Sequence, residues 1–296
     1  MKKKAPLFLG LIILTVTPIF AQQGSDIYLF DFKMDESFFS LSNPQNITSN
    51  VGYDNQPHFL PDGKSLYYSA DDGFGQTDIY RYYLSSDSER RITYSPGSEY
   101  SPIPTPDGDN VSCIILEQNG TQKLWKYRSN GGLATLVSDL EPVGYHVWYG
   151  ADKLGLFILD DQNKLVVHDL ASDTSAEVDK NIGRTLLRIP GTNHVSYVKL
   201  KSDENWIIMR LNMVSMEKSE IIKSLPGSQD YTWSKDGIML SGDGERLFKF
   251  NPATDATWVE IANLKDYGLN TFNRLALSPD GTKLAMVVNE AKLPDQ

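Results

Sequence analysis

The sequence of 296 residues is poor in cysteine and in positive charge. It contains one cysteine, which excludes a scaffold held by internal disulfides, so a packed core must stabilise the protein. Lys and Arg number 28 against 38 Asp and Glu, a formal net charge of -10, and no basic cluster follows residue 4. This imbalance argues against an electrostatic nucleic-acid binder, because phosphate recognition needs a basic face. The hydrophobic content of 40% excludes a disordered or multi-span membrane chain.

Long apolar runs are also missing, except at the amino terminus. Three lysines at positions 2–4 precede an apolar run over residues 7–20, and Ala21 ends a short cleavage site. This order is typical of a secretory signal peptide over residues 1–21, and the run is shorter than the roughly 20 residues that an uncleaved anchor needs. Cleavage would remove three of the 28 basic residues and take the net charge from -10 to -13. No cysteine lies at the junction to carry a lipid, so we expect an exported protein, periplasmic or secreted, without stable membrane insertion.

The single cysteine, Cys113, lies in the β-rich apolar run 111–116. A free cysteine in such a run is typically a small, buried core residue. A nucleophilic role would need a neighbouring base, which the sequence does not identify. We therefore predict a buried thiol within a strand.

A turn sequence recurs through the whole chain. Four strong copies contain Asp-Gly and two weaker copies do not, and they lie at 61–64, 106–109, 151–153, 190–192, 235–237 and 279–282. We use the aspartate of each turn, or the residue in its place, as the marker of the repeat. The markers lie at positions 62, 107, 152, 190, 236 and 280, so successive markers are 45, 45, 38, 46 and 44 residues apart. Such a period is that of a four-stranded propeller blade. The sequence therefore predicts an all-β fold, a six-bladed β-propeller of four-stranded antiparallel blades.

The composition of the turn predicts that it joins two antiparallel strands. Proline presets the first corner, aspartate bonds its own following backbone, and glycine accepts the positive φ that ends a bulged hairpin. Short β-branched and aromatic runs flank the turns, at 56–60 and 65–69 around the first and at 273–278 and 283–288 around the last.

A third strand is predicted about seventeen residues after the marker in five repeats, at 78–82, 123–127, 164–167, 206–209 and 246–250. The sixth repeat ends too near the carboxyl terminus to add two strands. Residues 25–31 and 44–48, however, repeat the pattern of 77–82 and 90–93. We therefore expect the amino-terminal strands to pair with the carboxyl-terminal blade, which closes the ring and removes exposed strand edges. This arrangement predicts a complete chain with a single propeller domain over residues 22–296.

Two of the repeats carry a pattern known from other propellers. Residues 59–64, with Tyr67, Tyr68 and residues 78–80, resemble the WD-like repeat of the TolB family, as do residues 277–284. The resemblance extends over about residues 25–290. It implies a six-bladed propeller of the bacterial envelope that binds partner proteins, with an extended peptide entering the mouth of the central channel. We expect the chain to differ from TolB itself in having no preceding α/β domain, since the first predicted blade strand begins directly after the signal segment.

Catalytic and metal-binding motifs are absent from the sequence. It has no G-x-S-x-G, H-E-x-x-H or C-x-x-C, and its four histidines, at positions 58, 146, 168 and 194, lack metal-ligand spacing. The acidic stretch 71–78 does not match a calcium loop, and its Asp and Gly residues are typical of a turn. We expect no cofactor and no metal.

The propeller topology predicts where a binding site would lie. The start of each innermost strand lines the channel mouth, on the face opposite the Asp-Gly turns. We take the residue six positions before each marker and, in the first two repeats, also the residue two positions earlier. These are the predicted mouth residues: Asp54, Gln56, Glu99, Ser101, His146, Arg184, Asp230 and Arg274. Nearby aromatic residues would add interface contacts: Tyr53, Phe74, Tyr100, Tyr145 and Tyr231. The alternative is that strand starts near solvent are polar without binding anything.

Two functions remain compatible with these features. The first is an exported, monomeric module that binds an envelope protein or an extended peptide through the channel mouth. The second is a hydrolase or lyase with a metal or carboxylate site in the channel, formed by residues His146, Asp54, Glu99 and Asp230. The lack of a nucleophile or metal signature favours the binding module.

Overall fold

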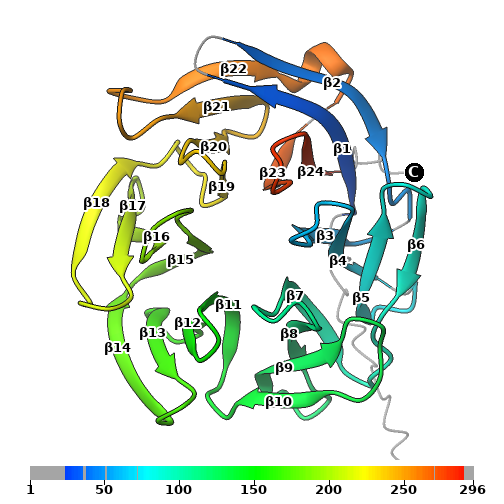
Figure 1. The fold of residues 1–296 in the computed structure, drawn as a ribbon, viewed down its shortest axis with the longest axis vertical. Coiled ribbons are helices and arrows are strands. Elements are labelled where there is room, and N and C mark those ends of the chain that lie inside the picture. The colour runs from blue at the N-terminus through cyan, green and yellow to red at the C-terminus, as the bar shows by residue number, and fades with distance from the viewer. Residues whose placement is uncertain (1–23, 36–37, 51, 72, 270, 290–296) are drawn as a thin grey trace, which may run out of the picture.

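The computed structural model of the protein is a ring of six β-sheets (Figure 1). It describes residues 24–289 except 36–37, 51, 72 and 270, so the predicted signal peptide lies outside the described residues. Each sheet has four antiparallel strands, which confirms the predicted six-bladed propeller. A single-turn 3-10 helix, η1 (Leu264–Tyr267), follows the outermost strand of the fifth blade. No helix in this described part of the chain is long and apolar enough to cross a membrane.

Five blades consist of consecutive strands, which run in chain order from the channel outward. Blade 1 contains β3 (Asp54–Phe59), β4 (Ser65–Asp71), β5 (Thr77–Tyr83) and β6 (Ser88–Arg91). Blade 2 contains β7 (Ser98–Pro104), β8 (Asn110–Leu116), β9 (Gln122–Arg128) and β10 (Thr135–Ser138). Blade 3 contains β11 (Val143–Tyr149), β12 (Lys153–Ile158), β13 (Lys164–Asp169), β14 (Thr174–Lys180). Blade 4 contains β15 (Ile182–Arg188), β16 (His194–Ser202), β17 (Asn205–Asn212) and β18 (Lys218–Lys223). Blade 5 contains β19 (Tyr231–Trp233), β20 (Met239–Gly242), β21 (Arg246–Phe250) and β22 (Val259–Asn263).

The sixth blade joins the two ends of the chain, as predicted. Its strands are β23 (Phe272–Leu277), β24 (Lys283–Asn289), β1 (Ser25–Met34) and β2 (Phe39–Asn46). β1 pairs antiparallel with β24, with Ile27 opposite Val287. The structure extends the first strand past the expected residue 31 and starts the second at Phe39 instead of residue 44, because Phe32 and Phe39 pack edge to face at 5.7 Å. Pro44 is tolerated there because β2 is the outer edge strand.

The Asp-Gly turns have the predicted geometry. In the first, Asp62 Oδ1 accepts a hydrogen bond of 2.9 Å from the backbone N–H of Lys64, and Gly63 has φ 66°. In the last, Asp280 Oδ1 accepts from the N–H of Thr282 at 3.0 Å. Only glycine adopts this left-handed φ without strain, so the turn sequence determines a tight connection from each innermost strand to the second.

The core lies between neighbouring blades and consists of side chains from the inner strands. Tyr67, Tyr68 and Tyr197 are among the largest fully buried side chains, and Phe30 on β1 is 0% exposed. Burying a side chain of this size contributes roughly 1.5–3 kcal/mol. Cys113 is buried on β8, which confirms the predicted core thiol.

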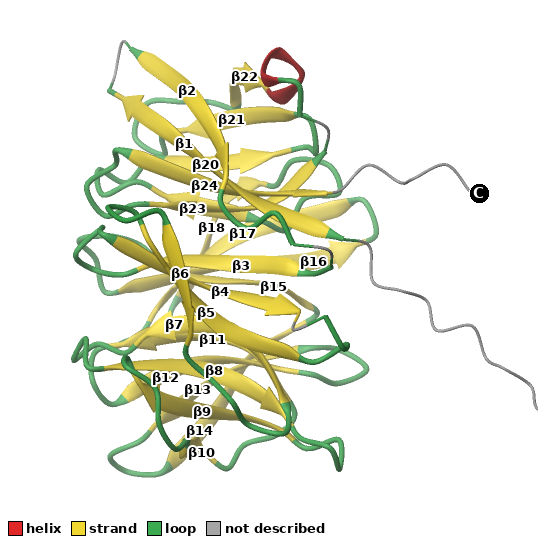
Figure 2. Ribbon diagram, turned by 90° about the vertical axis from the view of Figure 1, so that its right-hand side faces the viewer, coloured by secondary structure: helices red, strands yellow, loops and turns green. Residues whose placement is uncertain are grey.

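The ring has two faces, which Figure 2 shows edge on. We call the face where the innermost strands begin the mouth face, and the face that carries the Asp-Gly turns the turn face. Ser25 pairs with Asn289 and bridges Tyr53 at the start of blade 1. The two ends of the described chain therefore lie together at the mouth face.

Candidate binding sites in the central channel

A bulge distorts five of the six innermost strands near the mouth face. The register of pairing shifts between Asn55 and His58 in β3 and between Tyr100 and Ile103 in β7, with similar shifts in β11, β15 and β23. Gln56 and Ser101 occupy the bulges with φ of 59° and 55°. Left-handed backbone is uncommon for residues other than glycine and often lies next to functional sites. Because a bulge redirects a side chain, these shifts aim mouth residues into the channel.

Side-chain amides hold the bulged backbone in place. Asn55 Oδ1 accepts from the N–H of Gln56 at 2.8 Å, and Asn273 Oδ1 accepts in the same way from Arg274 at 2.6 Å. Other amides link neighbouring blades: Gln56 Oε1 accepts from the N–H of Ser101 at 2.6 Å, and Gln229 Oε1 from that of Arg184 at 2.9 Å. The mouth is therefore a hydrogen-bonded frame rather than a ring of independent strand ends.

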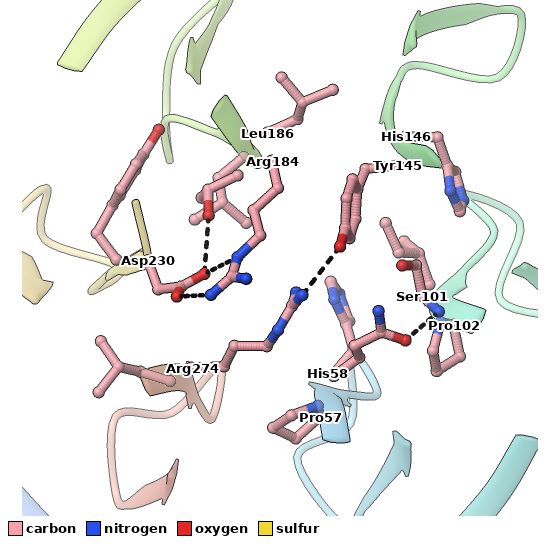
Figure 3. Close-up of a pocket in the computed structure, with 16 residues that line it drawn as sticks. Pro57, His58, Ser101, Pro102, Tyr145, His146, Arg184, Leu186, Asp230 and Arg274 are labelled. Atoms are coloured by element: carbon pink, nitrogen blue, oxygen red, sulfur yellow. Dashed lines mark hydrogen bonds and ion pairs between the residues drawn. The ribbon is translucent and has the colours of Figure 1, made fainter. Parts of the chain in front are cut away.

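This frame encloses a cavity of about 110 Å³, which we call the mouth cavity (Figure 3). Its lining includes six of the eight predicted mouth residues: Gln56, Ser101, His146, Arg184, Asp230 and Arg274. Two of the nearby aromatic residues, Tyr145 and Tyr231, also line it. All six blades therefore bring polar side chains to one space.

Two arginines of the mouth cavity differ in how their charge is balanced. Arg184 makes a forked ion pair with Asp230, with Nε 3.0 Å from Oδ1 and Nη2 bonded to Oδ2. Arg274 instead donates from Nη2 to the Tyr145 hydroxyl at 3.0 Å, with its guanidinium 5.3 Å from the centre of that ring. No carboxylate among the described residues lies within ion-pair distance of Arg274. Within that part of the chain, the cavity contains one neutralised guanidinium and one that lacks an anionic partner (Figure 3).

His146 is a neutral imidazole at the side of the mouth cavity. Its Nε2 lies 2.7 Å from Ser112 Oγ, which also accepts from Trp148 Nε1 at 2.8 Å and donates to a backbone carbonyl at 3.0 Å. Because the Ser112 hydroxyl donates its proton to the backbone carbonyl, it must accept from His146. We therefore assign the imidazole proton to Nε2. Burial lowers the pKa of His146 to about 3, and the neighbouring His58 acts in the same direction. A group with this pKa is a weak general base at neutral pH.

Three buried polar atoms of the cavity lining have no hydrogen-bond partner among the described residues. They are the hydroxyl oxygens of Ser101, which is 8% exposed, and of Tyr231, which is 3% exposed, and Nδ1 of His146, which is 2% exposed. An unpaired buried polar atom costs roughly 1–3 kcal/mol. A ligand group that bonds any of these atoms would recover part of that free energy.

The structure places Asp54 and Glu99 outside the mouth cavity, at the joints between blades. Glu99 is fully buried and accepts from the Tyr127 hydroxyl at 2.9 Å and from Ser95. Burial raises the pKa of Glu99 to about 7, and the charge of Asp78 acts in the same direction. Burial likewise raises the pKa of Asp54 to about 7. A regular strand would put side chains two residues apart on one face, but the left-handed residues that follow break that alternation.

The proposed catalytic group is therefore not brought together. His146 and Asp230 line the mouth cavity, whereas Asp54 and Glu99 do not. Within the described part of the chain, no three His, Cys, Asp or Glu side chains form an arrangement that could hold a metal ion.

The remaining predicted aromatic residues differ in position. Tyr53 and Tyr100 pack edge to face at 6.4 Å. Burial raises the pKa of Tyr53 to about 12, and the nearby charge of Arg274 opposes that rise. Phe74, by contrast, is 93% exposed and does not line the cavity.

A second space opens toward the turn face, and the sequence patterns did not predict it. This turn-face cavity has a volume of about 450 Å³, and its lining includes Trp148, Trp233, Phe59 and Arg188. Ile103 and Leu186 line both cavities, so they form part of the channel waist between them. The signal in the sequence is a large aromatic residue shortly before the marker in three repeats, namely Phe59, Trp148 and Trp233.

Comparison with solved structures finds propellers of the predicted kind. The chain matches a putative TolB from Agrobacterium tumefaciens with a TM-score of 0.69 and 16% identity, covering 92% of this chain and 100% of that chain. It matches TolB from Acinetobacter baumannii with a TM-score of 0.58 and 12% identity, covering 90% of this chain and 64% of that chain. An oligogalacturonate lyase in complex with manganese matches with a TM-score of 0.52 and 15% identity, covering 92% of this chain and 99% of that chain.

These likenesses establish a TolB-like propeller fold for the chain. No protein-family model and no curated protein matches the sequence. The neighbours include both TolB proteins and a lyase, so the choice between binding and catalysis depends on the residues of the channel.

Proposed function

We propose that the protein is an exported module of the bacterial envelope that binds a partner protein through the mouth face. The partner would place an acidic group, either a carboxylate side chain or a chain end, in the mouth cavity. The observation that carries this proposal is Arg274, a half-buried guanidinium without a carboxylate partner among the described residues. A carboxylate from the partner would make a charge-assisted hydrogen bond there.

The size of the mouth cavity favours a segment of a protein over a free small molecule. Pockets for drug-sized ligands usually measure about 300–1,000 Å³, whereas this one measures about 110 Å³. That volume accepts a single side chain or chain end. The rest of an extended segment would contact the rim, where Tyr53 and Tyr100 offer aromatic edges of the kind enriched at interfaces.

Export is proposed from the apolar, lysine-led segment at residues 1–21. After its removal the net charge of -13 would repel anionic lipid surfaces. This balance supports a partner that is a protein rather than a membrane, and recognition of an acidic group would then depend on local positive charge at Arg274.

We favour binding over hydrolase or lyase chemistry because the polar groups of the mouth are poorly suited to proton transfer. The pKa of His146 is lowered to about 3 by burial, and its Nε2 bonds to Ser112. Asp230 is bound by Arg184 in the forked pair. An imidazole with so low a pKa and a carboxylate held by a guanidinium are both poorly suited to act as general bases near neutral pH.

Crosslinking in the native cell followed by mass spectrometry would identify the partner and the segment that it inserts. Calorimetry with that segment would then compare the wild type with Arg274→Glu and with a matched control, Lys235→Glu, an exposed residue on the turn face. We expect Arg274→Glu to weaken binding at least tenfold, about 1.4 kcal/mol, and Lys235→Glu to leave it unchanged. Equal affinity of the wild type and Arg274→Glu would refute the proposed site.

A further inference from the structure

The turn-face cavity differs from the mouth cavity in chemistry and size. Its volume of about 450 Å³ lies within the usual range for small-molecule sites, about 300–1,000 Å³. Aromatic, aliphatic and proline side chains dominate the lining, and no Asp or Glu of the described chain belongs to it. This space therefore suits a whole apolar ligand rather than a single inserted side chain.

Two tryptophans give the turn-face cavity rigid walls. Trp148 Nε1 donates to Ser112 Oγ at 2.8 Å, and Trp233 Nε1 donates to Ser196 Oγ at 2.9 Å. In each case the serine lies on the second strand of the preceding blade, so a neighbouring sheet fixes the tip of the indole. With both N–H groups already bonded, the rings offer only apolar carbon to a ligand. Such preformed walls reduce the ordering cost of binding.

One positive charge lies in this apolar lining. Arg188 is exposed, and its guanidinium stacks on the Tyr149 ring at 5.7 Å. No ion pair joins Arg188 to a carboxylate among the described residues. The other ionisable group of the lining, His58, has a pKa lowered to about 4 by burial and is neutral at pH 7.

The aspartates of the turns beside this cavity accept hydrogen bonds from backbone N–H groups of the same turns. Asp62 bonds the N–H of Lys64, and Asp107 bonds that of Asp109 at 3.0 Å. Neither aspartate belongs to the lining, so Arg188 supplies the charge of the lining itself, within a chain whose overall charge is -10. A ligand group that pairs with Arg188 would carry a negative charge.

We infer that the turn-face cavity is a second binding site, for a small amphipathic anion with an aromatic or aliphatic body and one carboxylate or sulfonate. The apolar body lies between Trp148 and Trp233, and the anionic group pairs with Arg188 at the opening. This site shares the waist residues Ile103 and Leu186 with the mouth cavity but does not use Arg274.

Two fluorescent probes with related apolar bodies test this inference in the full exported chain. 1-Anilinonaphthalene-8-sulfonate carries one negative charge, and N-phenyl-1-naphthylamine is its neutral counterpart. We expect saturable binding of the sulfonate with one site per chain, with energy transfer from tryptophan to the bound probe. Octanoate should displace the sulfonate more effectively than octanol does.

Variants separate the charge from the apolar walls. Arg188→Gln should weaken binding of the sulfonate about tenfold, as expected for loss of a 1.4 kcal/mol contact, and should leave the neutral probe unchanged. Trp233→Phe should weaken both probes, whereas Arg128→Gln, an exposed arginine outside the lining, should affect neither. Circular dichroism of each variant would verify that the fold is intact. Absence of saturable sulfonate binding, or equal affinity of the wild type and Arg188→Gln, would overturn the inference.

Discussion

Arg274 and Tyr145 meet across the channel mouth. Arg274 lies on β23 of blade 6 and Tyr145 on β11 of blade 3, the opposite blade of the ring, and Nη2 donates to the hydroxyl at 3.0 Å. Figure 3 shows the two side chains pointing toward each other from opposite sides of the cavity. This hydrogen bond between opposite blades crosses the channel, so a segment that enters the mouth must contact Arg274 or Tyr145.

Removing the Tyr145 hydroxyl should make Arg274 more available to a partner. Tyr145→Phe keeps the ring beneath the guanidinium but deletes the hydrogen bond. Because a typical hydrogen bond contributes about 0.5–1.5 kcal/mol, we expect affinity for the inserted acidic segment to rise by up to about tenfold. Calorimetry would measure it, with Tyr149→Phe as the control, since that hydroxyl bonds Asn193 away from the mouth. Weaker binding by Tyr145→Phe would mean that the hydroxyl contacts the ligand.

The buried Glu99 should make stability depend on pH in an unusual direction. Its pKa is raised from 4.5 to about 7 by burial, so the native state binds this proton more tightly than the unfolded chain does. The stabilisation is complete below pH 4.5 and is lost as pH rises to about 7. Thermal unfolding between those values should show the melting temperature of the wild type falling more steeply than that of Glu99→Gln. The exposed Glu204→Gln should retain the slope of the wild type.

Closure of the ring should depend on apolar contacts of β1. Phe30 is 0% exposed and packs in the core of blade 6, so Phe30→Ala should lower the free energy of unfolding by roughly 3–5 kcal/mol. The same substitution at Phe38, which is 53% exposed, should change it by less than about 0.5 kcal/mol. Urea unfolding measures both. Equal, small effects would show that the amino-terminal strands contribute little to the stability of the ring.

Manganese should not stabilise the protein. His146 and Asp230 both line the mouth cavity, but Arg184 already pairs with Asp230, which leaves Nδ1 of His146 as a lone ligand atom, and the other two carboxylates of the predicted group lie outside the cavity. We expect neither manganese nor a chelator to shift the melting temperature. A saturable rise with manganese that His146→Ala abolishes would contradict this prediction and favour the lyase alternative.

Much of the fold could be predicted because turn chemistry is local. The Asp-Gly turns at residues 62–63 and 280–281 restrict φ and bond their own backbone, so each indicates a hairpin without reference to distant residues. Ring closure followed from matching residues 25–31 to 77–82, and the pairing of β1 with β24 confirms it.

The predicted mouth residues differ in where the structure places them. Equal spacing from the marker selected Gln56 and Arg274, which both line the mouth cavity, because the blades repeat the same backbone path. The same rule extended by two residues placed Asp54 and Glu99 at the mouth, whereas the structure buries them at the blade joints. The left-handed bulge at Gln56 has one local contact, with Asn55, and one contact between blades, with the Ser101 backbone 45 positions away. The second contact depends on the assembled ring.

The sequence alone determined the six repeats, the antiparallel hairpins and the blade shared by the two termini, since each depends on short-range turn and strand preferences. Only the tertiary structure decided which charges meet. Arg184 and Asp230 come together over 46 positions, and Arg274 reaches Tyr145 over 129. Curvature of the ring sets these distances, and it arises from packing of whole blades against one another. Arg274, which lacks an anionic partner among the described residues, and the apolar cavity beside Arg188 therefore became visible only in the assembled ring.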